Sequence, residues 1–106
     1  MKAITGSFYF KKTFNGNLIG EFANNDPSSM VITENANIQN SIFGFIGTYI
    51  STWYDNASHQ AQLEIKAIGN KSTFSLIWTE NGKITYEGEA FLQDENILVG
   101  FYQTKN

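Results

Sequence analysis

Four hydrogen-bonding side chains in residues 17–51 are the candidates for chemistry, and the chemistry they suit is the binding of a small polar ligand. They are Asn24, Ser28, Tyr49 and Ser51. Alternate residues of a strand face the same side, so Tyr49 and Ser51 are expected together, and Asn24 beside Phe22. Ser28 lies in a turn. Such a set predicts a pocket with several donors beside aromatic walls, although Asn and Ser are by themselves common turn residues.

Composition disfavours catalysis and metal binding. The 106 residues include no Cys and a single His, His59, which is expected to be exposed in a polar loop. Neither a thiolate site, a zinc cluster nor a Ser/His/Asp arrangement is expected. Glu87 and Glu89 flank Gly88 on the expected outer face, where they are solvated rather than paired for acid–base work. We therefore predict no enzyme activity, no metal and no cofactor.

Charge and hydropathy also limit the partners. The net charge of −3 opposes a phosphate-backbone partner, and the seven Lys and Arg residues form no long basic run. No apolar run has the length of a membrane span, and residues 1–15 lack the apolar region of a secretory signal. We expect no nucleic acid and no membrane as partner. The compartment stays open, because a leader can be removed.

Alternating apolar and polar residues predict short strands joined by turns. Residues 3–14 place Phe8 and Phe10 on one face, and Asn15-Gly16 predicts a type I′ hairpin into residues 17–23. The next segments are a turn at 24–29, a short strand at 29–34, an Asn-rich turn at 35–40 and a long strand at 41–54. Gly44 and Gly47 in that long strand predict a bend or bulge.

The second half of the chain continues the pattern. Residues 60–68 alternate cleanly, and 73–79 place Phe74, Leu76 and Trp78 in one row. Asn81-Gly82 predicts a second hairpin, into residues 83–92. After a turn at 94–96, Ile97, Val99 and Phe101 are predicted to form the inner row of the last strand.

These elements predict an all-β fold in one domain, residues 1–106: an eight-stranded antiparallel up-and-down β-barrel. Closing the barrel removes the sheet edges and leaves a mouth for one small ligand. A two-sheet sandwich is the alternative, but the hairpin signals join neighbours in order and no long crossover is evident.

The order of these motifs resembles the avidin and streptavidin family. The family's first strand has Gly-x-aromatic followed by Asn and a turn with Ser, and a later strand has Gly-Thr-Tyr-x-Ser/Thr. The matching residues here are Gly20-Glu21-Phe22, Asn24, Ser28 and Gly47-Thr48-Tyr49-Ile50-Ser51. Further along, TFSLIW, ITYEGEAF and ILVGFY are similar to later strands of the family, so that the likeness covers most of residues 17–103.

The resemblance implies a circularly permuted strand order. The family's last strand has no counterpart after Tyr102, but Lys2-Ala3 through Gly6 and Phe10 are similar to it. In a closed barrel that strand neighbours the family's first, as a hairpin at Asn15-Gly16 would arrange. Residues 3–14 are therefore expected to pair with both 17–23 and 97–102.

The resemblance also implies a ligand, biotin or a related ureido compound. By this resemblance, Asn24, Ser28 and Tyr49 would bind the ureido oxygen of the ligand, and Ser51 would bind a ureido N–H. The apolar walls would be Trp78, Tyr86 and Phe101. Phe8 stands where the family has an Asp or Asn for the other N–H and accepts no hydrogen bond, so weaker binding or a different ligand is expected.

Two other classes of function stay open. One is a lipocalin-like barrel that binds another small apolar molecule, and the other is an interaction barrel that acts through outer-face residues such as Ile50, Ile77 or Phe91. A homo-oligomer held by the later strands is also expected, with Ile77, Phe91 and Leu98 facing outward. Convergence of the four polar residues on one cavity would favour the avidin-like class.

Overall fold

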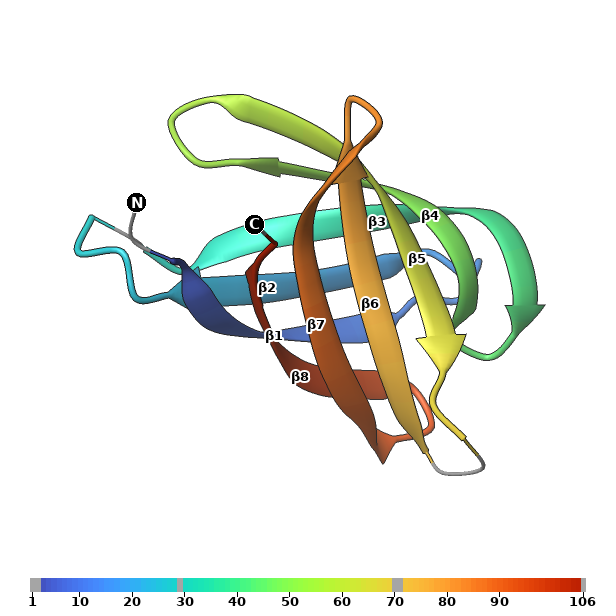
Figure 1. The fold of residues 1–106 in the computed structure, drawn as a ribbon. Helices are drawn as coiled ribbons and strands as arrows, with labels where there is room; N and C mark the ends of the chain where they lie inside the picture. Colours follow the sequence, from blue (N-terminus) through green and yellow to red (C-terminus); the bar gives the residue numbers. More distant parts are fainter. Residues whose placement is uncertain (1–2, 29, 70–71, 106) are drawn as a thin grey trace.

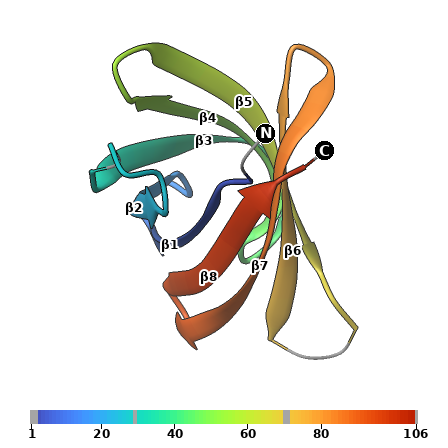
Figure 2. The same ribbon diagram turned by 60° about the vertical axis from the view of Figure 1, so that its left-hand side comes forward.

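The protein is an eight-stranded closed β-barrel in the computed structural model, which describes residues 3–28, 30–69 and 72–105. The strands are β1 (Thr5–Lys12), β2 (Leu18–Asn24), β3 (Ile32–Phe43), β4 (Ile46–Tyr54), β5 (Ser58–Ala67), β6 (Thr73–Glu80), β7 (Lys83–Asp94) and β8 (Ile97–Thr104). Each strand pairs antiparallel with the next (Figures 1 and 2). The predicted up-and-down barrel is confirmed. The described part of the chain has no helix of the length and apolarity that a membrane crossing requires.

Strand β1 closes the barrel because it pairs on both edges. Phe8 lies opposite Phe22 of β2 and opposite Gly100 of β8. The expected double pairing of the first strand is therefore confirmed. Beyond β1, Thr104 donates its backbone N–H to the carbonyl of Ile4 at 2.9 Å, so the two ends of the described chain meet at one end of the barrel (Figure 1).

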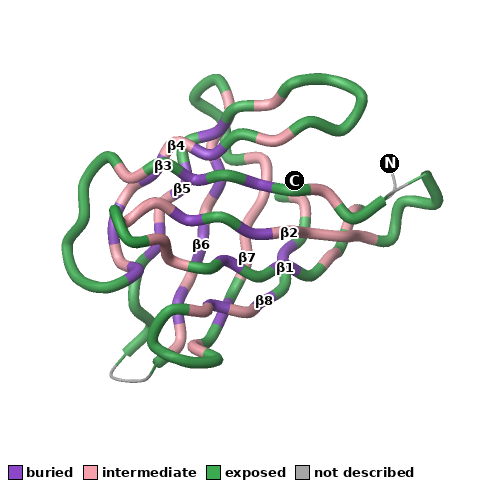
Figure 3. Tube along the Cα trace, turned by 180° about the vertical axis from the view of Figure 1, so that it is seen from behind, coloured by how far each residue is buried: buried purple, intermediate pink, exposed green. Residues whose placement is uncertain are grey.

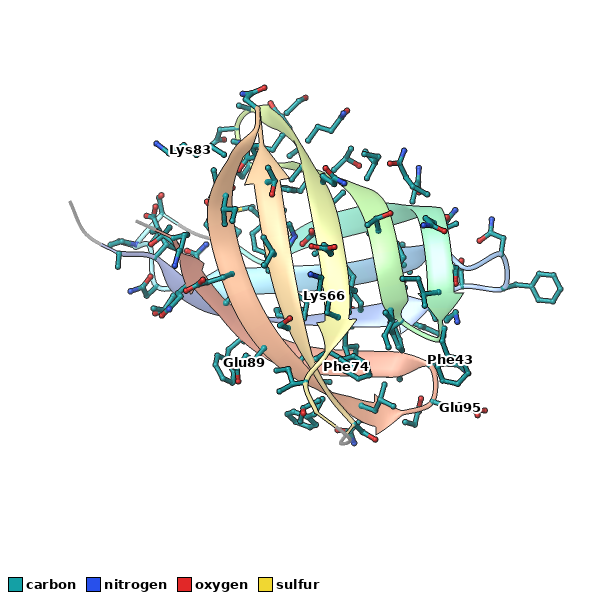
Figure 4. The ribbon with its side chains drawn as sticks, turned by 45° about the vertical axis from the view of Figure 1, so that its right-hand side comes forward. Phe43, Lys66, Phe74, Lys83, Glu89 and Glu95 are labelled. Atoms are coloured by element: carbon teal, nitrogen blue, oxygen red, sulfur yellow. The ribbon has the colours of Figure 1, made fainter. Side chains whose placement is uncertain are left out.

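The core consists of the side chains that alternate inward along all eight strands, visible as purple segments in Figure 3. The row of Phe74, Leu76 and Trp78 predicted for β6 is buried as expected. The largest fully enclosed side chains are Phe10, Leu18, Tyr49, Leu63, Ile65, Leu76 and Leu98. Outer-face residues such as Glu89 project away from the barrel (Figure 4).

Both Asn-Gly pairs form hairpins, but with different turns. Asn81 and Gly82 have φ of 52° and 78°, the left-handed pair that a type I′ turn requires, and they join β6 to β7 directly. At the other pair only Gly16 has positive φ, 90°, and the Thr13 N–H donates to the Asn17 carbonyl across a wider loop. The type I′ prediction is confirmed at Asn81-Gly82 and wrong at Asn15-Gly16.

The Asn-rich turn predicted for residues 35–40 is wrong, because those residues lie within β3. Asn35 and Asn37 face solvent while Ala36 is buried, so the strand alternation continues through the segment. Strand β3 ends instead before Gly44, whose φ is 58°. The expected irregularity exists: the β3–β4 register shifts between Ser41 and Phe43, next to the position opposite Gly47.

The inner row predicted for the last strand is also wrong. Leu98, Gly100 and Tyr102 point inward, while Phe101 is 61 % exposed. Both alternate sets of β8 are apolar, so hydropathy does not determine which faces the core; pairing with β1 does, since Leu98 lies opposite the buried Phe10. For the same reason the expectation that Leu98 faces outward is wrong.

Candidate functional site

A cavity of about 40 Å³ lies at the end of the barrel where the β2–β3, β4–β5 and β6–β7 loops lie with both ends of the described chain (Figure 1). We call it the open-end cavity. It is lined by nine residues: Phe8, Phe22, Asn24, Glu34, Trp53, Asp55, Trp78, Tyr86 and Tyr102. Every strand except β5 supplies at least one of them, and Asp55 follows β4 directly.

Six of the nine lining residues are aromatic, and their rings contact one another mostly edge to face. The Phe22 ring is perpendicular to Trp53, with centroids 6.1 Å apart, and to Tyr102, at 5.9 Å. Trp78 meets Phe8 at 5.7 Å in the same manner. Such pairs contribute about 0.5–1.5 kcal/mol each beyond the area they bury. The walls of the cavity are therefore fixed by packing.

Glu34 is the buried acidic residue at the cavity, and it is 4 % exposed. The Ser51 hydroxyl and the Trp78 indole N–H, the latter at 2.8 Å, both donate to its Oε2. Its Oε1 has no hydrogen-bond donor among residues 3–28, 30–69 and 72–105, and because no fully buried side-chain polar atom in those residues lacks a partner, Oε1 is open to the solvent of the cavity. Burial raises the pKa of Glu34 to about 7, against the opposing effect of the two hydrogen bonds. One oxygen of a buried carboxyl group is therefore free to accept a hydrogen bond.

A second polar group is formed by Asn24 and Tyr102. The Asn24 amide donates from Nδ2 to the Tyr102 hydroxyl at 3.1 Å, and its Oδ1 accepts the Asp26 N–H at 3.0 Å. Because the Tyr102 oxygen accepts this bond, its own proton is free to be donated. Burial raises the pKa of Tyr102 to about 12, which keeps the hydroxyl protonated at neutral pH.

Acidic groups and His59 surround the mouth. The His59 ring stacks on Trp53, with centroids 5.2 Å apart and planes within 7°. Its Nε2 lies 2.6 Å from Oδ1 of Asp55, and its Nδ1 lies 3.7 Å from Oε1 of Glu80. His59 was expected in an exposed loop; it lies in β5 and is half-buried, since the Trp53 ring covers it.

Three of the residues predicted for the site, Asn24, Trp78 and Tyr86, line the open-end cavity. Ser51 lies behind it and reaches it through Glu34. Ser28 is exposed, and its hydroxyl donates to Asp26 at 2.8 Å; it lines a surface groove that shares Asn24 with the cavity.

Two predicted residues lie away from the cavity. Tyr49 is fully buried deeper in the barrel, where its hydroxyl donates to the Phe45 carbonyl at 2.8 Å. Phe101 is outside the barrel, so its predicted role as a cavity wall is wrong. Tyr102, its neighbour in β8, provides that wall. The four polar residues therefore do not converge on one cavity.

Glu34, Trp53, Asp55 and Tyr102 were missed by reasoning from the sequence. A signal for Glu34 existed: it has the parity of Ala36, and both point inward. The turn predicted for residues 35–40 ends the strand before this alternation becomes visible. The parity error in β8 likewise hid Tyr102.

Comparison with protein-family models, with curated proteins and with solved structures found no match. Within the described residues, no group of three or more His, Cys, Asp or Glu side chains is placed to hold a metal ion. The residues of the open-end cavity can bind a ligand by hydrogen bonds and electrostatic attraction, and the surrounding aromatic rings enclose it.

Proposed function

We propose that this chain is a small-molecule-binding protein whose ligand occupies the open-end cavity. Glu34 carries the proposal, because the side chain is largely buried while its Oε1 faces the cavity without a protein donor within the described ranges. Burying a carboxylate is costly unless it is hydrogen-bonded. A ligand N–H at Oε1 would give this oxygen a fixed donor in place of solvent.

A ureido ligand of the kind that avidin-like proteins bind is the first candidate. The Tyr102 hydroxyl would donate to the ureido oxygen, with Asn24 holding that hydroxyl in place. Glu34 would accept a ureido N–H, the role that Phe8 is unable to perform. The donors and acceptor of this proposal therefore differ from Ser28 and Tyr49, which the resemblance implied.

The size of the cavity favours a small ring. Pockets for drug-sized ligands measure about 300–1,000 Å³, whereas about 40 Å³ accommodates a few waters or a small head group. Biotin would have to displace side chains at the mouth and bring its carboxylate toward Asp55. We therefore propose biotin as a weak ligand and the isolated cyclic urea, 2-imidazolidinone, as a better one.

Binding without catalysis is the proposed activity. The nine lining residues include no Ser, Thr, Cys or Lys that would act as a nucleophile. The same cavity would also suit a lipocalin-like function, in which another small apolar molecule packs against the aromatic walls. A ureido ligand would bind the free oxygen of Glu34, whereas an apolar ligand would not.

Self-association is a second candidate function, favoured by an apolar outer patch. Phe91 of β7 lies opposite Val99 of β8, which lies opposite Tyr9 of β1, and Phe101 adjoins them. Phe91 is 49 % exposed. Such a row suits an isologous dimer interface. Light scattering at high micromolar concentration that gives the monomer mass would reject this candidate.

Ligand binding is tested by calorimetry and by fluorescence. Both tryptophans of the chain, Trp53 and Trp78, line the cavity, so occupancy should change the intrinsic emission. We expect 2-imidazolidinone to alter emission saturably, and biotin to do so more weakly. Glu34→Gln should weaken both, while Glu89→Gln, on the outer face, should not. Absence of heat and of any emission change with small neutral and charged compounds alike would reject the binding function.

A further inference from the structure

Resting on that proposed function, we infer that the open-end cavity is built for a small organic ammonium ion, whose N–H donates to Glu34 Oε1 and whose charge faces the surrounding rings. The ligand class is therefore cationic, in contrast to the neutral ureido group considered above.

The enclosure has the composition of a cation-binding cage. Its six aromatic side chains include both tryptophans, and a cation is attracted to an aromatic face when it lies within about 6 Å of the ring centre. The rings stand at steep angles to one another: Tyr86 meets Tyr102 at 80°, and Phe22 meets Trp53 at 89°. Rings held at such angles wall the cavity on different sides, so that a small ion inside would contact several of them.

The charges at the cavity have one sign. Glu34 and Asp55 are the ionisable carboxyl groups among the nine lining residues, and none of the nine is Lys, Arg or His. A third carboxyl group, that of Glu80, lies near the mouth, because the His59 ring contacts Asp55 through Nε2 and Glu80 through Nδ1. The field of Glu80 and Asp55 extends inward, because both help to raise the pKa of Tyr86, after the larger effect of burial. An anionic ligand would be repelled and a cationic one attracted.

Glu34 provides the specific anchor within that field. Its Oε2 is occupied by Ser51 and Trp78, which fixes the carboxyl group and leaves Oε1 as the position for a ligand donor. A carboxylate in so apolar a site lacks a counter-ion among the described residues that line the cavity. An ammonium group would supply charge and hydrogen bond together, and such charge-assisted bonds are roughly twice as strong as neutral ones.

The volume limits the ligand to a small head group. About 40 Å³ suits a primary or methylated ammonium with a short alkyl stem, while a longer substituent would leave through the mouth beside Asp55. The neutral comparison compound must therefore be equally small. 1-Propanol matches propylammonium in length and differs in lacking the charge.

The test compares these two compounds and 2-imidazolidinone on the unmodified protein, by tryptophan emission and calorimetry at pH 8. At this pH Glu34 is largely ionised and an alkylammonium stays protonated. We expect propylammonium to bind at least about tenfold more tightly than 1-propanol, because a charge-assisted bond and ring contacts favour it. Glu34→Gln should remove that preference, and Glu89→Gln should retain it.

The outcomes separate the two proposals. Binding of 2-imidazolidinone without binding of propylammonium would overturn the ammonium class and leave the binding function standing. Equal affinity for propylammonium and 1-propanol would overturn it as well. Binding of none of the three compounds would reject both. Because the compounds are compared on the unmodified protein, the decision does not depend on the folding of Glu34→Gln.

Discussion

Replacing Glu34 by Gln should make the protein more stable at alkaline pH, although it removes a hydrogen-bonded residue. In the unfolded chain this carboxyl group ionises near its ordinary pKa of 4.5, whereas burial raises the pKa to about 7 in the barrel. Between these values the folded state binds more protons than the unfolded state, so stability falls as pH rises. The loss begins near pH 4.5 and is complete above about pH 7. At about 1.4 kcal/mol per pKa unit it amounts to about 3 kcal/mol.

Gln has the size of Glu and accepts from Ser51 or Trp78 at its amide oxygen, but it does not titrate. The free-energy difference between variant and unmodified protein should therefore grow by about 3 kcal/mol from pH 4 to pH 8. Urea unfolding followed by circular dichroism at several pH values measures this difference. Glu89→Gln is the control, because that side chain is exposed on the outer face. A variant difference that stays constant across the pH range would refute the raised pKa of the buried Glu34 carboxyl group.

Three other substitutions probe the barrel and its cavity. Tyr49→Phe should cost about 1–3 kcal/mol of unfolding free energy, because the Phe45 carbonyl loses its buried donor, and should leave the affinity for propylammonium unchanged; a large loss of affinity would place Tyr49 at the site after all. Phe101→Ser should leave ligand-induced emission changes intact, since the ring lies outside the barrel. Gly20→Ala should cost about 1–3 kcal/mol in chemical unfolding, because an added Cβ would overlap the Tyr9 carbonyl; unchanged stability would mean that β1 and β2 are less closely paired than described.

Local patterns were sufficient to predict the barrel. The alternation in β5 and β6 and the Asn81-Gly82 turn each depend on neighbouring residues alone. The inward face of β8 was not predictable in this way, because both of its faces are apolar and pairing with β1 decides between them. The turn prediction for residues 35–40 was wrong for a related reason, since Asn favours turns but is also tolerated on the solvent-exposed face of a strand.

The site was less predictable than the fold, because a cavity depends on which strand ends meet. Asn24 was found from its type and parity, and Trp78 and Tyr86 were named because of the resemblance to the avidin family. Glu34 was not, since an acidic residue is normally expected on the outer face, and only its burial beside Ser51 and Trp78 reveals its importance. Asp55 and Trp53 approach the mouth from the end of β4, a position that no short motif marks.

The closure of the barrel by β1 has a consequence for how the chain reaches its native state. Thr5 pairs with Gln103, so the first described strand completes its second edge only when the last is available. During synthesis on the ribosome, β1 would wait with one edge unpaired until β8 emerges, whereas β2 pairs with the next strand, β3. Non-local pairing of this kind slows folding, typically to milliseconds or longer. Meanwhile the positive charges of Lys11 and Lys12, at the end of β1, would disfavour pairing of its open edge with other nascent chains.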